Sequence, residues 1–153
     1  MGTHYTGTPE EVQALDTYIK LLRALNTVRI RIDEREQLGP LKGSPFGVLE
    51  MLHHIGPQTQ TVIGKKLLVS KSNVVAIIDK LEKRKLVVRQ RSTEDRRRIY
   101  VHLTEAGRAE IEKLLPLHVA AITRAMSSLD LIEQRQLGNL CRKLGVNEPV
   151  EDN

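Results

Sequence analysis

The chain has 153 residues, one cysteine and a net charge of +5, with 40% apolar, 28% charged and 3% aromatic residues. This is the composition of about one globular domain, and it excludes a disulfide framework, a cysteine-based zinc site and an aromatic platform for single-stranded nucleic acid. No apolar run reaches the roughly 18 residues of a transmembrane helix, and the N-terminal MGTHYTGTPEE has no signal-peptide pattern, so we expect a cytoplasmic protein.

The first expected element is a long amphipathic helix, from about Glu10 to Gln37, that Gly39 and Pro40 stop. Its apolar residues recur at helical spacing and form one stripe: Val12, Leu15, Ile19, Leu22, Leu25, Val28 and Ile32. A small domain cannot cover a stripe of this length by itself, so the stripe predicts a partner.

Two short helices are expected next. In GSPFGVLEMLHHIGP, Ser44 is the expected N-cap, Pro45 the first helical residue and Gly56-Pro57 the stop. Thr59 then caps a short helix within TQTVIGKKL.

A further helix is expected from an N-cap at Ser70 to about Arg84. Its expected core face is Val74, Val75, Ile78 and Leu81, with Ile77 on the flank. The opposite face carries Ser72, Asn73, Ala76, Lys80 and Lys83.

The segment after this helix predicts a two-stranded hairpin with a long tip. The β-rich residues Val87, Val88, Ile99, Val101 and Leu103 flank a polar loop from Gln90 to Arg98. Thr104 is the expected cap of a helix from Glu105, with the apolar stripe Ile111, Leu115, Val119, Ile122 and Met126. Asp130 and Glu133 form a capping box for a last helix that Gly145 ends.

The charge of the chain is concentrated in its middle. Residues 65–98 contain 12 basic and 4 acidic residues, a net +8, so the rest of the chain carries −3. A basic middle between acidic arms favours a nucleic-acid partner over a solvated basic face. The order of helix, short helix, turn, helix and hairpin is that of a winged helix-turn-helix. Its capped helix fits the DNA major groove and its arginine-rich loop fits the minor groove.

The stretch STEDRRRIYVHLTEAG resembles the wing and following helix of the MarR family of bacterial and archaeal regulators, whose pattern is D-x-R, a strand and L-T-x-x-G. Upstream, PFGVLEML, IGKKL and VVAIIDKLEKRKLV resemble the family's second, third and recognition helices, so the match runs from about Gln37 to Gly107. By motif position, Asp95 and Arg97 match the wing pair, with Arg97 in the groove. From the residues alone, Asp95 is expected to hold the loop in shape.

The expected fold class is mainly α with a little β (α+β): a winged helix-turn-helix with a helical dimerisation module, about six helices and a small β-hairpin wing. The resemblance implies a homodimeric repressor of a pseudo-palindromic operator. The expected domains are residues 1–40 for an N-terminal dimerisation helix, 44–104 for the DNA-binding lobe and 105–147 for C-terminal dimerisation helices. Expected dimer contacts are Leu15, Ile19, Leu22, Ile122, Met126, Leu137, Leu140 and Leu144.

The expected contacts to double-stranded DNA are Thr59, Ser70, Lys71, Ser72, Asn73, Lys80, Arg89, Arg91, Asp95, Arg96, Arg97 and Arg98. Plain N-capping and solvation is the alternative for the Ser-Lys-Ser-Asn stretch. The resemblance also implies a small phenolic or aromatic effector, with Tyr18, Met51, His54 and His118 as candidate lining residues. Core packing is the favoured alternative for these four.

Other functions have less support. Gly-rich phosphate loops are missing and no nucleophile has a neighbouring base, so we expect neither an enzyme nor a cofactor. His53 and His54 point about 100° apart on a helix, and the other histidines are distant, so we expect no metal. Cys141 is interpreted as an inert thiol in the dimer interface rather than a redox sensor. A winged helix that docks an acidic protein, or that binds every duplex nonspecifically, is the rival interpretation.

Overall fold

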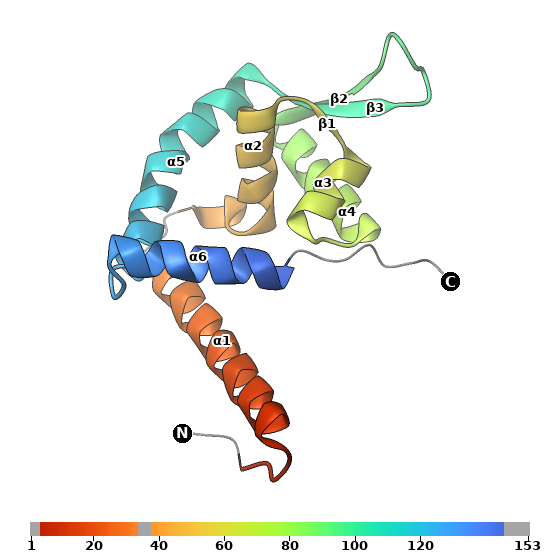
Figure 1. Cartoon of the computed structure of the whole chain (residues 1–153). Coiled ribbons are helices and arrows are strands. Elements are labelled where there is room, and N and C mark those ends of the chain that lie inside the picture. Colours follow the sequence, from red (N-terminus) through yellow and green to blue (C-terminus); the bar gives the residue numbers. More distant parts are fainter. Residues whose placement is uncertain (1–3, 34–37, 146–153) are drawn as a thin grey trace. The chain divides into compact units, whose positions relative to one another are not determined.

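The structure, a computed structural model, describes residues 4–33 and 38–145 of the chain (Figure 1). These residues form six α-helices, one 3₁₀ turn and three short strands. In chain order they are α1 (Pro9–Asp33), η1 (Gly39–Leu41), α2 (Ser44–Ile55), β1 (Gln58–Thr59), α3 (Gln60–Leu67), α4 (Lys71–Lys83), β2 (Val87–Arg91), β3 (Ile99–Leu103), α5 (Glu105–Ala125) and α6 (Leu131–Gly145). No helix in the described ranges is both long and apolar enough to cross a membrane.

The chain divides into two compact units. The central unit, residues 36–119, contains η1, α2 to α4, the sheet and most of α5. The terminal unit combines residues 1–35 with residues 120–153, and so contains α1, the end of α5 and α6.

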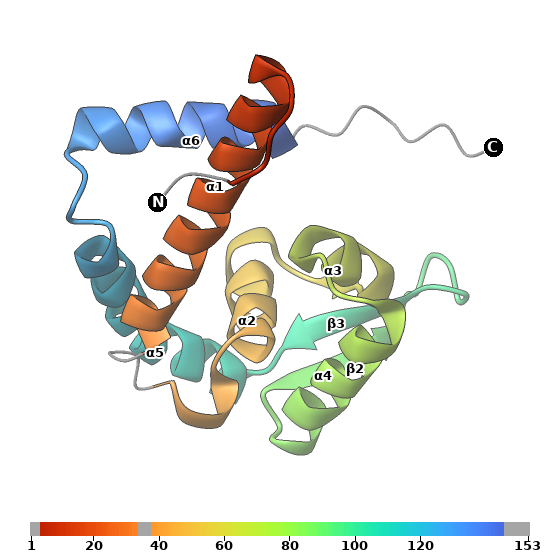
Figure 2. The same ribbon diagram turned by 90° about the horizontal axis from the view of Figure 1, so that it is seen from below.

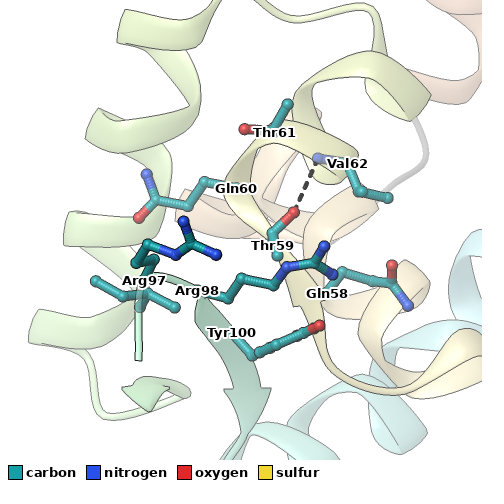
Figure 3. A pocket seen from close by; sticks show the side chains of 9 residues that line it. Gln58, Thr59, Gln60, Thr61, Val62, Arg97, Arg98 and Tyr100 are labelled. Carbon is teal, nitrogen blue, oxygen red and sulfur yellow. Dashed lines mark hydrogen bonds between the residues drawn. The ribbon is translucent and has the colours of Figure 1, made fainter. Parts of the chain in front are cut away.

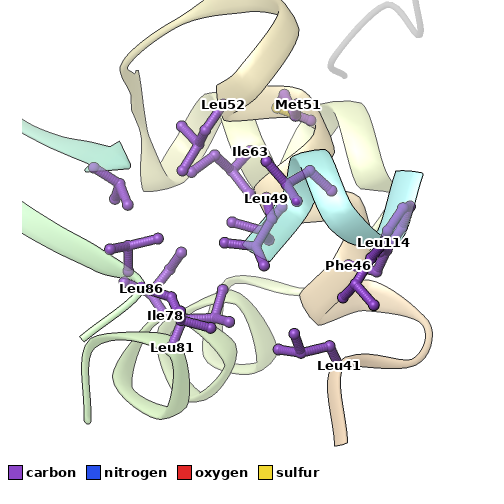
Figure 4. Packing of buried hydrophobic residues seen from close by; sticks show 14 of the residues in the cluster. Leu41, Phe46, Leu49, Met51, Leu52, Ile63, Ile78, Leu81, Leu86 and Leu114 are labelled. Atoms are coloured by element: carbon purple, nitrogen blue, oxygen red, sulfur yellow. The ribbon is translucent and has the colours of Figure 1, made fainter. Parts of the chain in front are cut away.

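A core of aliphatic side chains holds the central unit together (Figure 4). Each of its elements contributes to this core except β1: among the most buried side chains are Leu41, Leu49, Ile63, Ile78, Val101 and Ile111. The low aromatic content of the sequence therefore does not prevent close packing, because leucine, isoleucine and valine fill the interior.

The sheet has three antiparallel strands in the order β1-β3-β2. The expected two-stranded hairpin is confirmed as β2 and β3, and β1 is a third strand that was not predicted. Gln58 pairs with Val101 and Thr59 with Tyr100. This strand escaped prediction because two residues cannot show an alternating pattern. The β2–β3 pairing continues to Arg91 opposite Ile99, which shortens the expected loop to residues 92–98. The hairpin projects beyond the helices of the central unit (Figures 1 and 2).

Four predicted N-terminal caps are confirmed. In each, the side-chain oxygen accepts a hydrogen bond from the backbone N–H three residues later, at 3.4 Å for Thr59 and Ser70, 3.0 Å for Thr104 and 2.9 Å for Asp130. The capping box is complete, because the carboxylate of Glu133 accepts in return from the backbone N–H of Asp130 at 2.9 Å. At these four helices, a short polar side chain before an apolar run marks the helix start.

The predicted cap of α2 was wrong. Ser44 is the first residue of the helix and Pro45 the second, while Gly43 occupies the cap position without a side-chain hydrogen bond. Gly43 has φ +80°, a value that glycine adopts without the steric cost of a Cβ. The chain therefore enters α2 through a glycine turn rather than through a serine cap.

The buried face of α4 is rotated slightly from the prediction. Val74, Ile78 and Leu81 are buried as expected, but Val75 is 37% exposed. Ile77, expected on the flank, packs against the core instead. Successive helical residues are 100° apart, so residues 74, 77, 78 and 81 make one stripe and residue 75 falls outside it.

The long helices of the terminal unit leave much of their apolar surface exposed. No residue of α1 or α6 is fully buried. Leu25, Leu140 and Leu144 are 52%, 65% and 72% exposed. The α1 helix has a reciprocal cap that was not predicted, in which Glu11 N–H donates to Thr8 Oγ1 and Thr8 N–H to Glu11 Oε2. Its expected end at Gln37 lies outside the described residues.

The stripe of α5 also differs from the prediction. Ile111 is buried and Leu115 is partly buried, but Val119 is 52% exposed. Leu114, Ala121 and Ala125 are buried instead. The inner face therefore includes small alanines, which a search for large apolar residues passes over.

Leu68, at the end of α3, adopts a backbone conformation that is unfavourable for leucine. It has φ 53° and ψ 41°, the left-handed region, and its side chain is 93% exposed. Asparagine tolerates this region better, so Leu68→Asn should raise the free energy of unfolding by about 1 kcal/mol. Urea denaturation followed by circular dichroism measures this. Leu68→Ala, which keeps a Cβ, should change little; an equal gain in both variants would contradict the backbone explanation.

Candidate nucleic-acid interface

The first turn of α4 presents polar side chains to solvent. The Oγ of Ser70 accepts from the backbone N–H of Asn73 and lies 3.3 Å from the Oγ of Ser72. The exposed residues of this outward face are Lys71, Ser72, Asn73, Ala76, Lys80 and Lys83. All of them except Ala76 carry hydrogen-bonding or cationic groups, and the DNA major groove is wide enough to admit an α-helix.

The tip of the wing, residues 92–98, is held by its own hydrogen bonds. Asp95 Oδ1 accepts from the backbone N–H of Arg97 at 3.0 Å and from its Nε at 3.1 Å. Asp95 Oδ2 lies 3.5 Å from the Nε of Arg98. Ser92 closes the other side, because its Oγ accepts from the backbone N–H groups of Glu94 and Asp95 at 3.2 Å. The expected shaping role of Asp95 is therefore confirmed.

These contacts also keep Asp95 ionised. The backbone hydrogen bond from Arg97, and then its side-chain hydrogen bond, lower the pKa of the Asp95 carboxyl below its ordinary value. A depressed pKa means that the bridge is present at neutral pH and is lost only in acid, as the pH falls through the lowered pKa. The loop therefore keeps its shape throughout the neutral range.

The arginines of the tip face solvent. The side chain of Arg97 is 92% exposed and that of Arg98 is 65% exposed, although both face Asp95. Arg91 donates from Nη1 to the backbone carbonyl of Arg96 at 3.2 Å, which links the end of β2 to the tip. The result is a compact cationic finger, whose charge would attract a polyanion.

Arg89 has a different environment from the other predicted DNA contacts. Its guanidinium donates to Glu82 Oε2 at 2.6 Å, to Asp79 Oδ1 at 2.6 Å and to Gln60 Oε1 at 2.7 Å. Its side chain is only 23% exposed. Burial opposes its charge, but hydrogen bonds to Asp79 and Glu82 outweigh burial and raise the pKa of the guanidinium. Arg89 was predicted as a DNA contact together with the tip arginines, and unlike them it is partly buried and bonded to side chains of α3 and α4.

A pocket of about 560 Å³ separates the wing from the start of α3 (Figure 3). Arg97 and Arg98 face it from one side, and the segment Gln58–Val62 faces it from the other. Among the residues that the structure describes, no acidic residue lines it, and the remaining lining residues are Ile99 and Tyr100. Thr59, an expected DNA contact, lies in this pocket, where it also caps α3. The pocket therefore gathers hydrogen-bond donors at the side of the wing.

The base of the wing is locked to the end of α4. Thr104 Oγ1 donates to the carbonyl of Lys85 at 2.7 Å, and Thr104 N–H donates to the carbonyl of Leu86 at 3.1 Å. Gly107 follows one turn later, and a Cβ added there would overlap the carbonyl oxygen of Leu86. The L-T-x-x-G pattern is thus a docking element: threonine bonds the turn after α4, and glycine allows the close approach.

The candidate effector residues do not share one environment. Met51 is buried in the core, and the ring of His118 lies 4.4 Å from that of Phe46 in tilted contact. His54 and Tyr18 are exposed. Tyr18 belongs to the terminal unit and the other three to the central unit. In the described residues, no group of three or more His, Cys, Asp or Glu side chains is placed to hold a metal.

The expected dimer contacts all lie in the terminal unit, and Cys141 is exposed there in the single chain. Leu15, Ile19, Ile122 and Met126 are partly buried. Leu22, Leu137, Leu140 and Leu144 are exposed. An apolar groove of about 290 Å³ lies beside them, between Ala24–Arg31 of α1 and Ala125–Leu137.

Sequence analysis missed three residues that organise the interface, Gln60, Asp79 and Glu82, and named Gly107 only as part of the family's L-T-x-x-G pattern. Their roles depend on contacts with residues distant in the sequence, 29 positions apart for Gln60 and Arg89. Asp79 and Glu82 are the two acids on a helix whose other charged residues are lysines, and Glu82 lies five positions before the first residue of β2. They were the available signal for the ion pairs. Acids on a surface meant for DNA need a basic partner.

Comparison with known proteins agrees with this geometry. The MarR family profile matches residues 40–98. Over 142 residues, 90% of each chain, the sequence is 38% identical to the uncharacterized HTH-type transcriptional regulator YkoM of Bacillus subtilis. It is 30% identical to the HTH-type transcriptional regulator MhqR of the same organism, over 88% of this chain and 93% of that one.

A solved structure extends the comparison to a DNA complex. A mutant of MarR from Escherichia coli, crystallised with operator DNA, superposes with a TM-score of 0.71 at 26% identity, over 84% of this chain and 95% of that chain. The fold is therefore a winged helix-turn-helix, as predicted from the order of the elements. The chain belongs to the MarR family of transcriptional regulators.

Proposed function

We propose that this protein is a homodimeric repressor that binds a pseudo-palindromic operator in double-stranded DNA, and that it is not an enzyme. One observation carries the proposal: a single compact unit contains both the exposed polar start of α4 and the cationic tip of the wing, where Asp95 forms an ion pair with Arg97. Such a pair suits a helix in the major groove and arginines in the adjacent minor groove. The operator complex of the Escherichia coli relative supports this assignment.

The exposed apolar residues of α1 and α6 support the dimer. Leucines of these helices that are 36% to 79% exposed, in a chain with no membrane-spanning helix in its described part, favour a protein partner for the terminal unit. A two-fold dimer would place two α4 helices about 34 Å apart, one turn of DNA. The proposal includes three domains: an N-terminal dimerisation helix at residues 1–40, a DNA-binding lobe at residues 44–104 and C-terminal dimerisation helices at residues 105–147. In such a dimer Cys141 would be an inert interface thiol.

The test is a gel shift with the DNA upstream of the protein's own gene. We expect saturable binding that excess nonspecific duplex does not displace, and a dimer by light scattering. Weak binding to every duplex alike would favour the nonspecific architectural alternative, and no binding would favour docking to an acidic protein. Either result, or a monomer at the concentrations that bind DNA, would contradict the proposal.

Release by a small phenolic or aromatic effector is a further part of the proposal, and the family resemblance supports it. Addition of simple phenolic and aromatic carboxylic acids to the protein–operator complex should dissociate it with at least one of them. Gel shifts with increasing acid measure this. A complex that resists the whole series would remove the effector from the proposal and leave operator binding unaffected.

A further inference from the structure

We propose that Arg89 is a positioning residue for DNA binding. It holds the wing, the start of α3 and α4 in a fixed arrangement, and it does not itself contact DNA. The inference rests on the proposed function and adds a role that is distinct from the tip arginines. It follows from the hydrogen-bond partners of the three guanidinium nitrogens. Nε reaches α3 at Gln60, and the two terminal nitrogens reach α4 at Asp79 and Glu82.

The carboxylate of Glu82 accepts two hydrogen bonds from Arg89. Its Oε2 accepts from the guanidinium of Arg89, and its Oε1 accepts from the backbone N–H of Arg89 at 3.0 Å. A bidentate acceptor between one strand and one helix fixes both distance and angle, because neither bond can rotate without breaking the other. β2 is therefore held against α4 by polar contacts as well as by the core.

The local charge argues against a DNA contact at this position. Asp79 and Glu82 together carry −2 against the single positive charge of Arg89, so a phosphate would meet a net negative cluster. Asp79 is 59% exposed at its side chain, on a helix whose other exposed charged residues are lysines. The electrostatic repulsion between Asp79 and DNA phosphates is offset if Asp79 holds Arg89 in position.

The cluster also orients Gln60. Because Arg89 Nε donates to the amide oxygen of Gln60, the amide NH₂ of Gln60 remains as a donor, and Gln60 is also one of the residues that line the pocket that Arg97 and Arg98 face. One side chain thereby sets three features of the interface: the tilt of the wing, its distance from α4 and the donor direction of Gln60.

The test compares Arg89→Met with Arg97→Met, two variants that remove the same charge and keep a similar stem. Affinity for the operator duplex is measured by fluorescence anisotropy at several salt concentrations. Arg89→Met should weaken binding about tenfold with an unchanged salt slope, whereas loss of a phosphate contact lowers the slope by about 1. A slope reduced in Arg89→Met as in Arg97→Met would overturn the inference.

The acidic partners give the more discriminating result. Asp79→Asn and Glu82→Gln each make the protein more positive, so electrostatics alone would tighten binding to DNA. Positioning requires the opposite, weaker binding in both. Arg89→Lys should not restore affinity, because a single ammonium cannot reach three acceptors in fork geometry. Tighter binding in the acid variants, or full affinity in Arg89→Lys, would refute the role.

Thermal unfolding by circular dichroism separates positioning from simple stability. Binding is measured where every variant is fully folded, and Glu82→Gln serves if Arg89→Met does not fold. An affinity loss that vanishes once the folded fraction is considered would reduce Arg89 to a stabilising residue and overturn the inference. If the wild-type protein shows no operator binding, the proposed function itself fails and the positioning role falls with it. If the wild type binds normally, the Arg89 results are judged alone.

Discussion

Replacing Gly107 with alanine should lower the free energy of unfolding by about 3 kcal/mol or more, the range of severe overpacking. The added Cβ would overlap the backbone carbonyl of Leu86, which is itself hydrogen-bonded to Thr104 N–H and cannot rotate away without loss of that bond. Either α5 or the turn after α4 must move. Urea denaturation of the purified variant, followed by circular dichroism, measures the change.

Gly138 provides the matched control. It lies within α6, and a Cβ there would meet nothing within 4 Å in the chain. Gly138→Ala should therefore stabilise the protein by up to about 1 kcal/mol, because alanine is the better helix former. The same substitution is expected to act with opposite signs at the two sites. Similar stability of Gly107→Ala and the wild type would show that the wing base is not packed as described.

Replacing Arg97 with methionine should weaken operator binding about tenfold and lower the salt slope by about 1. The guanidinium is 92% exposed and is presented by Asp95, so its loss removes a cation from the tip without removing a buried contact. Fold and thermal stability should be unchanged, because surface ion pairs contribute little. Anisotropy titrations of an operator duplex at several salt concentrations measure both quantities.

An exposed arginine elsewhere controls for net charge. Arg23 lies on α1 in the terminal unit and is exposed. Arg23→Met changes the total charge by the same amount, yet it should leave the salt slope as in the wild type, because slope reports contacts rather than total charge. Equal effects of the two variants would mean that the wing acts only through the overall field of the protein.

Much of the fold and part of the site could be predicted from the sequence. Helix starts were predictable where a serine, threonine or aspartate precedes an apolar run, as at Thr59, Ser70 and Asp130. The wing pair was predictable as well: Asp95 and Arg97 are two positions apart, so their bond forms within one turn. In each case the interacting groups are neighbours along the chain, and local patterns report local contacts.

The errors share the opposite property. β1 exists only because β3 lies beside it, and Val75 is exposed because the angle of α4 against the core excludes it. Arg89 carries the same charge as Arg97, and the acids of α4 that precede it did not by themselves show that Arg89 is partly buried while Arg97 is exposed. The distinction depends on Gln60, 29 residues away, and on two carboxylates one helix back.

The sequence by itself determined the order of the elements, the caps that start them, the basic middle and the family pattern of the wing, because each is written in residues a few positions apart. Only the tertiary structure decided which cations face outward, which one ties wing to helix, and why Gly107 must lack a side chain. The physical reason is that charge and volume act through space. Their consequences depend on groups that folding brings together from distant parts of the chain.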